Sequence, residues 1–153
     1  MPCNVINNPS FEAGIESWTP NGFAAVIASP VAYDGNNVLS LETAPSAPTV
    51  SVTQELYWLD TANVHNLTVQ VRVEGEIPTT SHCEVRAYLG EDPEAGEFAS
   101  DIIWNGGEWI QLEGSFQPTV RDTTISLVGY CTFNVADAEH IRVYFDDVIV
   151  SDC

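Results

Sequence analysis

The middle of the chain alternates between apolar and polar residues. In residues 67–73 the apolar positions are Leu67, Val69, Val71 and Val73, and the residues between them are Thr68, Gln70 and Arg72. Successive side chains of a β-strand point to opposite faces of its sheet, so this pattern predicts a strand with one buried face. No window combines a helical apolar stripe with capping residues. The chain is therefore predicted to be almost all β.

Similar short apolar segments recur along the whole sequence, separated by Gly, Pro, Asn and Asp. Together with a short strand at the start, we expect about nine strands. The others are expected at residues 23–28, 38–42, 49–57, 67–73, 85–89, 109–116, 123–133 and 141–150. The segment from Glu91 to Asp101 is rich in carboxylates and is expected to be a solvated acidic loop. Strands without intervening helices predict a single two-sheet β-sandwich over residues 1–153.

The four cysteines have spacings that fit disulfides better than a zinc or redox site. Cys83 shares the inward parity of its strand, as does Cys131, so a Cys83–Cys131 bridge is natural. Cys3 and Cys153 stand at the chain ends, which are often neighbours in a domain, and form the complementary pair. Disulfides indicate an oxidising, secretory environment.

Two further features agree with secretion. Asn66 begins an Asn-Leu-Thr glycosylation acceptor. Met1-Pro2 directly before Cys3 suggests a mature form whose leader has been removed. We therefore expect a secreted, extracellular glycoprotein.

The charge balance restricts the partners. Four arginines, no lysine and 22 carboxylates give a formal net charge of −18. Such a chain repels nucleic acids and anionic membrane surfaces, and no apolar run is long enough to cross a bilayer. Cationic partners and neutral polysaccharides both remain open, the latter because stacking and hydrogen bonds hold neutral sugars, and charge alone does not choose between them. We expect a monomer that binds a polysaccharide or oligosaccharide.

Four segments resemble the family 4 and 9 group of carbohydrate-binding modules, in the family's order and over almost the whole chain. They are Asn8-Pro9-Ser10-Phe11-Glu12 followed by Gly14 and Trp18, residues 34–41, residues 108–112 with Ser115-Phe116, and Tyr144-Phe145-Asp146-Asp147-Val148. The resemblance implies a jelly-roll topology and a glycan-binding rather than a catalytic role. Phe11 and Trp18 are expected to anchor the first loop to the sandwich.

The resemblance also implies a structural calcium ion where the two ends of the chain meet. Glu12 and Asp147 are the preferred side-chain ligands, and Asp146, Asp34 and Asn37 are further candidates. Oxygen ligands gathered from separate segments are what Ca²⁺ requires. The alternative is that the two aspartates merely end a strand and that Glu12 is a solvated loop residue.

Sugar recognition needs flat aromatic faces beside polar side chains. Trp104, next to Asn105 and a glycine-rich turn, is the preferred candidate, although it is as well explained as a core residue. The outward parity of two strands places a second set on one expected polar sheet face: Gln70, Arg72, Arg86 and Tyr88. Tyr33 is a further loop aromatic, and Tyr57 and Trp58 also lie near expected strand ends.

Three functions are compatible with the sequence. The first is a non-catalytic module for a plant or fungal cell-wall polysaccharide. The second is a structural, adhesive or protein-binding domain on the same fold, for which the arginines simply pair with carboxylates. The third is a small polysaccharide-degrading enzyme, which no nucleophile or metal motif supports. Exposed aromatic rings on one face favour the first, and buried rings favour the second.

Overall fold

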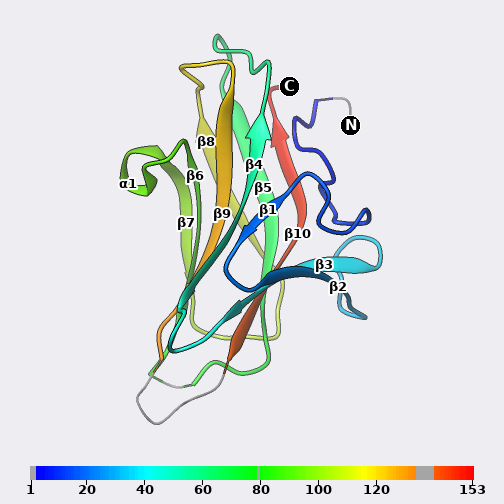
Figure 1. Cartoon of the computed structure of the whole chain (residues 1–153), viewed down its shortest axis with the longest axis vertical. Coiled ribbons are helices and arrows are strands. Elements are labelled where there is room, and N and C mark those ends of the chain that lie inside the picture. Colours follow the sequence, from blue (N-terminus) through cyan, green and yellow to red (C-terminus); the bar gives the residue numbers. More distant parts are fainter. Residues whose placement is uncertain (1–2, 79, 134–139) are drawn as a thin grey trace.

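The computed structural model describes residues 3–78, 80–133 and 140–153, which fold into two facing antiparallel sheets of five strands each (Figure 1). We name each sheet after its central strand. The β10 sheet has the order β2 (Ala24–Ala28), β3 (Asn37–Thr43), β10 (Ile141–Ser151), β5 (His65–Glu74), β8 (Ile110–Phe116). The β9 sheet has the order β1 (Thr19–Asn21), β4 (Thr49–Leu56), β9 (Thr123–Cys131), β6 (Cys83–Leu89), β7 (Glu97–Ile103).

The core between the sheets consists of the apolar positions of the alternating segments. All four predicted apolar residues of β5 are at most 1% exposed, and Val85 and Ala87 of β6 are completely buried. Phe145 of β10 is also completely buried. Burying one such side chain stabilises the fold by about 1.5–3 kcal/mol. The predicted all-β sandwich is confirmed.

The edge strands β1 and β7 were not predicted, whereas the short strand expected at the start of the chain forms only an isolated bridge between Asn4 and Ser151. The described residues therefore contain ten strands in place of the expected nine or so. β1 contains Pro20, which an edge strand tolerates because one side needs no hydrogen bonds. β7 occupies part of the expected acidic loop, whose remainder includes the one-turn helix α1 (Pro93–Gly96). Its carboxylates face solvent at the sheet edge, where charges are acceptable. No helix of the described residues is long and apolar enough to span a membrane.

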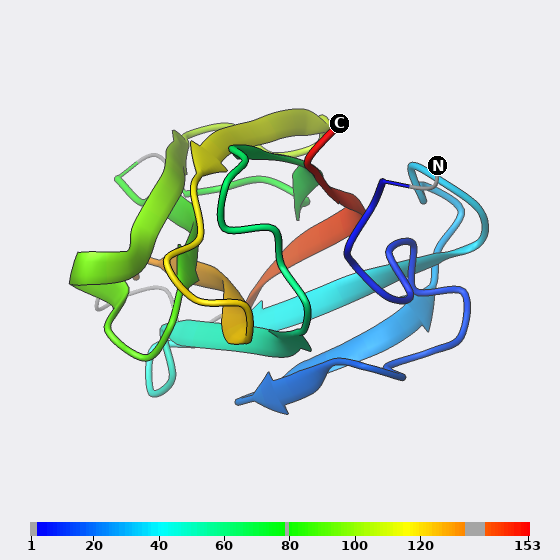
Figure 2. The same cartoon turned by 90° about the horizontal axis from the view of Figure 1, so that it is seen from above.

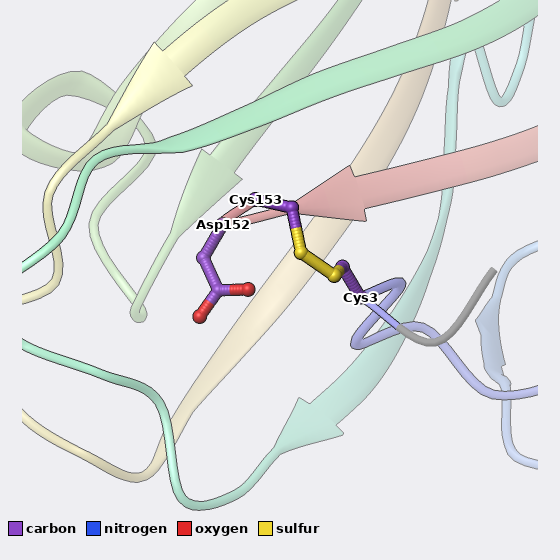
Figure 3. Close-up of side chains that lie close together, drawn as sticks. All are labelled: Cys3, Asp152 and Cys153. Atoms are coloured by element: carbon purple, nitrogen blue, oxygen red, sulfur yellow. A yellow bond between two sulfur atoms is a disulfide. The ribbon is translucent and has the colours of Figure 1, made fainter.

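Both expected disulfides are present. Cys83 and Cys131 are directly opposed residues of β6 and β9. Cys3–Cys153 joins the two ends of the chain, with Asp152 beside it (Figure 3). Seen from above, the ends lie together on the side of the sandwich away from α1 (Figure 2). The side chain of Asn4 reinforces this junction by donating to the carbonyl of Val148 and accepting from the amide of Val150.

Candidate functional site

The outer face of the β9 sheet carries a hollow of about 300 Å³, which we call the groove. Strands β1, β4, β9 and β6 form its floor, and α1 borders it through Pro93. Because only alternate residues of each strand face outward, the floor is polar although the strands are apolar on their inner side. The lining residues are Asn21, Thr49, Ser51, Glu84, Arg86, Tyr88, Pro93, Val128 and Tyr130.

Strand register places these side chains in rows across the sheet. Arg86 of β6 is opposite Val128 of β9, which is opposite Ser51 of β4. In the next row, Tyr130 lies between Glu84 and Thr49. Cross-strand neighbours on one face lie within contact distance, so each row is a continuous strip of surface.

Arg86 has one ionic partner at the groove. Its Nε lies 3.6 Å from a carboxylate oxygen of Glu97, and the two side chains are about one-third exposed. This pair holds the guanidinium in place while leaving donors accessible. A fixed guanidinium beside the ring of Tyr88 provides the stacking surface and the directed donors that sugar hydroxyls need.

Trp104 continues the same face beyond the groove. It is 58% exposed and its ring packs on that of His82, with ring centroids 4.8 Å apart. Glu84 and Ile102 are paired across β6 and β7. Because the strands are antiparallel, the next outward positions at this end of the pair are His82, two residues before Glu84, and Trp104, two residues after Ile102. Asn105 is exposed next to Trp104. Of the two alternatives for Trp104, the structure shows the exposed ring, and the alternative of a core residue is wrong.

Gln70 and Arg72 do not share this face, so the predicted single polar face of four residues is wrong. β5 belongs to the β10 sheet, and its outward side chains point away from the sandwich on the opposite side from those of β6. Gln70 is buried and donates to Gln111, 3.0 Å away, while Arg72 pairs with Glu74 at 3.8 Å. Parity along a strand shows which residues face outward but not which sheet the strand joins.

Tyr33 also lies apart from the groove. It belongs to the β2–β3 loop, is 51% exposed, and meets Trp109 edge to face with ring centroids 5.9 Å apart. The indole of Trp109 donates to the carbonyl of Val31, 2.8 Å away. This loop is therefore tied to the start of β8, so Tyr33 does not join Trp104 or Tyr88.

The expected calcium ligands gather around the same β2–β3 loop. Asp146 is completely buried and accepts backbone N–H groups of Tyr33, Asp34 and Asp147 at 2.8–3.0 Å. Burial raises the pKa of Asp146 to about 6. With so many donors on its oxygens, Asp146 serves to hold the loop against β10.

Glu12 supports the other end of this loop. Its carboxylate accepts the backbone N–H groups of Asn36 and Asn37. Gly35 suits this turn because its φ of 71° is one that residues with a side chain rarely adopt, and a Cβ atom 2.6 Å from the carboxylate carbon would displace Glu12 from these N–H groups. The side-chain Nδ2 of Asn37 donates to the carbonyl of Phe11, 3.2 Å away. Residues from distant parts of the sequence therefore build one corner, as the sequence predicted.

Asp34 and Asp147 are the carboxylates that face open space in this corner. They line a hollow of about 420 Å³ with Ser10, whose hydroxyl donates to Asp34 at 2.6 Å. A register shift in β10 after Asp146, with Asp147 at φ 51°, turns Asp147 out of the ladder. Burial and then the charge of Asp34 raise the pKa of Asp147. Two carboxylates that repel each other beside a hydroxyl fit a hard divalent cation.

Within the described residues, three potential metal-binding side chains come within 4.8 Å of one another only at Cys3, Asp152 and Cys153. Two of these form the disulfide and offer no thiolate (Figure 3). A cation at the corner around Asp34 and Asp147 would therefore have two carboxylates and would need backbone oxygens or water as further ligands.

Several groove residues were not identified from the sequence. Ser51, Val128 and Tyr130 face outward on strands that were predicted, so the same parity argument applied to β4 and β9 indicates them. Asn21 belongs to the unpredicted β1, and no sequence signal indicates its position.

Scans against protein-family models and a search of curated proteins found no match to this sequence. Solved structures do match. One is TmCBM61 in complex with β-1,4-galactotriose, 17% identical, with a TM-score of 0.68 over 98% of this chain and 99% of that one. Another is a family 16 carbohydrate-binding module, 18% identical, with a TM-score of 0.64 over 96% of this chain and 99% of that one.

A third match is the arabinose-bound α-L-arabinofuranosidase MgGH51, 17% identical, with a TM-score of 0.67 over 97% of this chain but only 26% of that one. The chain therefore corresponds to whole binding modules and to a small part of an enzyme. These similarities establish the jelly-roll fold of carbohydrate-binding modules. The matched modules belong to families 61 and 16, so the narrower family 4 and 9 assignment stays a prediction.

Proposed function

We propose that this chain is a secreted, monomeric, non-catalytic module that binds a neutral cell-wall polysaccharide in the groove of the β9 sheet. The observation that carries the proposal is the combination of a hollow lined by Arg86, Tyr88 and Tyr130 with the exposed ring of Trp104 on the same face. Exposed aromatic rings beside polar side chains are the arrangement that separates a glycan-binding module from a purely structural domain.

The charges of the groove favour an uncharged ligand. Glu84 lies 3.9 Å from His82, and Arg86 lies 3.6 Å from Glu97, so each charged side chain has an ionic or potential ionic partner. A neutral sugar accepts and donates hydrogen bonds here without breaking either pair. An anionic polymer would in addition meet the net charge of −18.

Binding is tested by titrating intrinsic tryptophan fluorescence with oligomers of xylan, β-glucan, mannan, galactan and chitin, followed by calorimetry. We expect saturable binding to one of them. Arg86→Ala and Tyr88→Ala should each weaken it about thirtyfold, because central aromatic and arginine anchors contribute at least about 2 kcal/mol. Trp104→Ala should also reduce the affinity.

The matched controls lie away from the groove, on β10 and in the β2–β3 loop. Arg142→Ala removes an exposed arginine paired with Glu42, and Tyr33→Ala removes an exposed tyrosine. Neither should change the affinity. If the groove variants bind like the parent chain, or if no glycan binds to the folded parent, the proposal is wrong and a protein-binding or adhesive role replaces it.

We further propose that a calcium ion binds between Asp34 and Asp147, while Glu12, Asp146 and Asn37 hold the surrounding loop. Calcium bound there would stabilise the fold and take no part in sugar contact. At a hundredfold excess over its dissociation constant, Ca²⁺ should raise the free energy of unfolding by about 3 kcal/mol.

Thermal unfolding with added Ca²⁺ and after chelation measures this stabilisation. Asp147→Asn and Asp34→Asn should abolish the shift, and Asp101→Asn, an exposed carboxylate in β7, should keep it. Equal unfolding temperatures with and without Ca²⁺ would show that the corner is held by hydrogen bonds alone.

Secretion and glycosylation belong to the same proposal. Asn66 is exposed at the start of β5, where its side-chain oxygen accepts the hydroxyl of Ser115 at 2.7 Å. We propose that it carries an N-linked glycan in the natural source. Asn66 lies on the β10 sheet, so this glycan would leave the groove open.

A further inference from the structure

The end of the sandwich where β4 leads into β5 presents the most exposed aromatic ring among the described large hydrophobic residues. Trp58 is 81% exposed, and its neighbour Tyr57 is 58% exposed. A bare indole is costly to leave in water, whereas single exposed aliphatic side chains are common. Neither the core nor the groove uses this ring.

The loop that carries Trp58 is held firmly. Leu59 is only 2% exposed, and its amide donates to the carbonyl of Arg121 at 2.9 Å. The amide of Trp58 donates to the carboxylate of Asp122 at 3.1 Å. Gln117 reaches across from the β8–β9 loop to the carbonyl of Thr61. The two loops lie side by side at the top of Figure 1.

Trp58 has a backbone conformation that bulky residues avoid, with φ 59°. Such a conformation costs about 1–3 kcal/mol and persists only where the surroundings enforce it. Glycine or asparagine would fit the turn better. The position thus keeps a large aromatic ring at the expense of local stability.

A hollow of about 220 Å³ lies beside the indole, lined by Trp58, Leu59, Asp60, Thr61 and Arg121. Arg121 differs from the other arginines. Those three pair with Glu74, Glu97 and Glu42, whereas the guanidinium of Arg121 has no ionic or hydrogen-bond partner among the described residues. In so acidic a chain, an unpaired guanidinium beside a bare indole leaves both groups available for a ligand.

We propose that Trp58 and Arg121 form a second carbohydrate-contact site, in which a pyranose ring stacks on the indole while its hydroxyl or carboxylate oxygens accept hydrogen bonds from Arg121. The inference rests on the proposed function and extends it to a second site. Planar donors of arginine match vicinal oxygens, and a rigid loop loses little entropy on binding.

The two sites are arranged for one long ligand. Ser51 in the groove and Trp58 are joined by β4, which at the usual rise of a strand places them roughly 20 Å apart. A short oligosaccharide fills one site, whereas a polymer reaches both. Simultaneous contact raises the apparent affinity for the polymer through effective concentration.

The test compares a short oligosaccharide with its parent polymer, using the intact chain and its variants. Trp58→Ala and Arg121→Gln should weaken retention by the polymer about tenfold and leave the affinity of the short oligosaccharide unchanged. Trp58→Asn removes the ring while suiting the turn, so it should lose the same retention without any fall in unfolding temperature. Neutral and uronate-containing polymers distinguish hydroxyl from carboxylate acceptors for Arg121.

Matched control variants and the groove variant Arg86→Ala distinguish a failure of the second site from a failure of the groove proposal. Val64→Ala, another exposed residue of the same loop, and Arg142→Gln should retain the polymer like the parent chain. If Trp58→Asn also retains the polymer like the parent chain while Arg86→Ala loses binding, the second site is refuted and the groove proposal is supported. If only the Trp58 and Arg121 variants lose binding, the groove proposal fails and the second site stands. No binding by the parent chain overturns both.

Discussion

Replacing Cys3 and Cys153 together by serine is expected to lower the free energy of unfolding by about 5 kcal/mol. The disulfide closes a loop with a sequence separation of 150 residues, and in the chain-entropy model a closure of this length restricts the unfolded chain strongly. Domains have a total free energy of unfolding of about 5–15 kcal/mol, so this loss should leave the variant only marginally folded. Chemical denaturation, with the denaturant slope compared between variants, measures the loss.

Selective reduction of the parent chain provides the control. Cys83 and Cys131 are completely buried, whereas Cys153 is exposed, so a mild phosphine reductant should open the terminal bridge first. The partly reduced chain should then match the double variant in stability. A loss below about 1 kcal/mol, the value of one ordinary hydrogen bond, would show that the contacts of Asn4 with β10 hold the chain ends without the disulfide.

Phe11→Ala should reduce stability by about 3–5 kcal/mol, as truncation of a buried phenylalanine usually does. Phe11 is completely buried and packs against Trp18, with ring centroids 5.6 Å apart. Its carbonyl also accepts a hydrogen bond from the side-chain Nδ2 of Asn37, so the ring positions the loop that carries the proposed calcium ligands. Denaturant unfolding gives the loss, and the Ca²⁺-dependent shift in unfolding temperature should decrease in parallel.

Phe23→Ala serves as the matched control because that ring is 67% exposed. Its effect should stay within about 0.5 kcal/mol. Phe11→Leu, which keeps most of the apolar volume, should cost clearly less than the alanine variant. Equal stability of Phe11→Ala and Phe23→Ala would mean that the first loop folds independently of the sandwich, which would also remove the structural basis of the calcium corner.

The sequence alone was sufficient for the fold class, for the interior faces of the long strands and for both disulfides. The fold class and the interior faces depend on local alternation: Val71 and Val85 are apolar, alternate with polar residues and face inward. Cys83 and Cys131 were paired by the same argument. The Cys3–Cys153 pair followed from the position of these cysteines at the chain ends. The two unpredicted strands lie at sheet edges, where Pro20 and the carboxylates of β7 reflect solvent exposure and obscure the β pattern.

The meeting of the residues proposed to bind calcium was predicted in part. Residues near Glu12 and near Asp146 do meet, since the N-terminal segment lies along β10, with the amide of Val148 donating to the carbonyl of Pro9. The sequence could not show which of the two neighbouring aspartates is buried on backbone N–H groups and which lines the hollow. A register shift in β10 turns Asp146 toward backbone donors and Asp147 toward the hollow, and such a shift depends on the partner strand rather than on the aspartates themselves.

Only the tertiary structure decided which outward residues share a face. Gln70 and Arg86 have the same pattern of neighbours in sequence, yet β5 joins one sheet and β6 the other, so their side chains lie on opposite sides of the sandwich. Likewise, the sequence placed Trp58 only near a strand end, and the tertiary structure adds Arg121, which lines the same hollow from another loop. Alternation is a local property of the chain, whereas strand order results from the packing of all ten strands against one core.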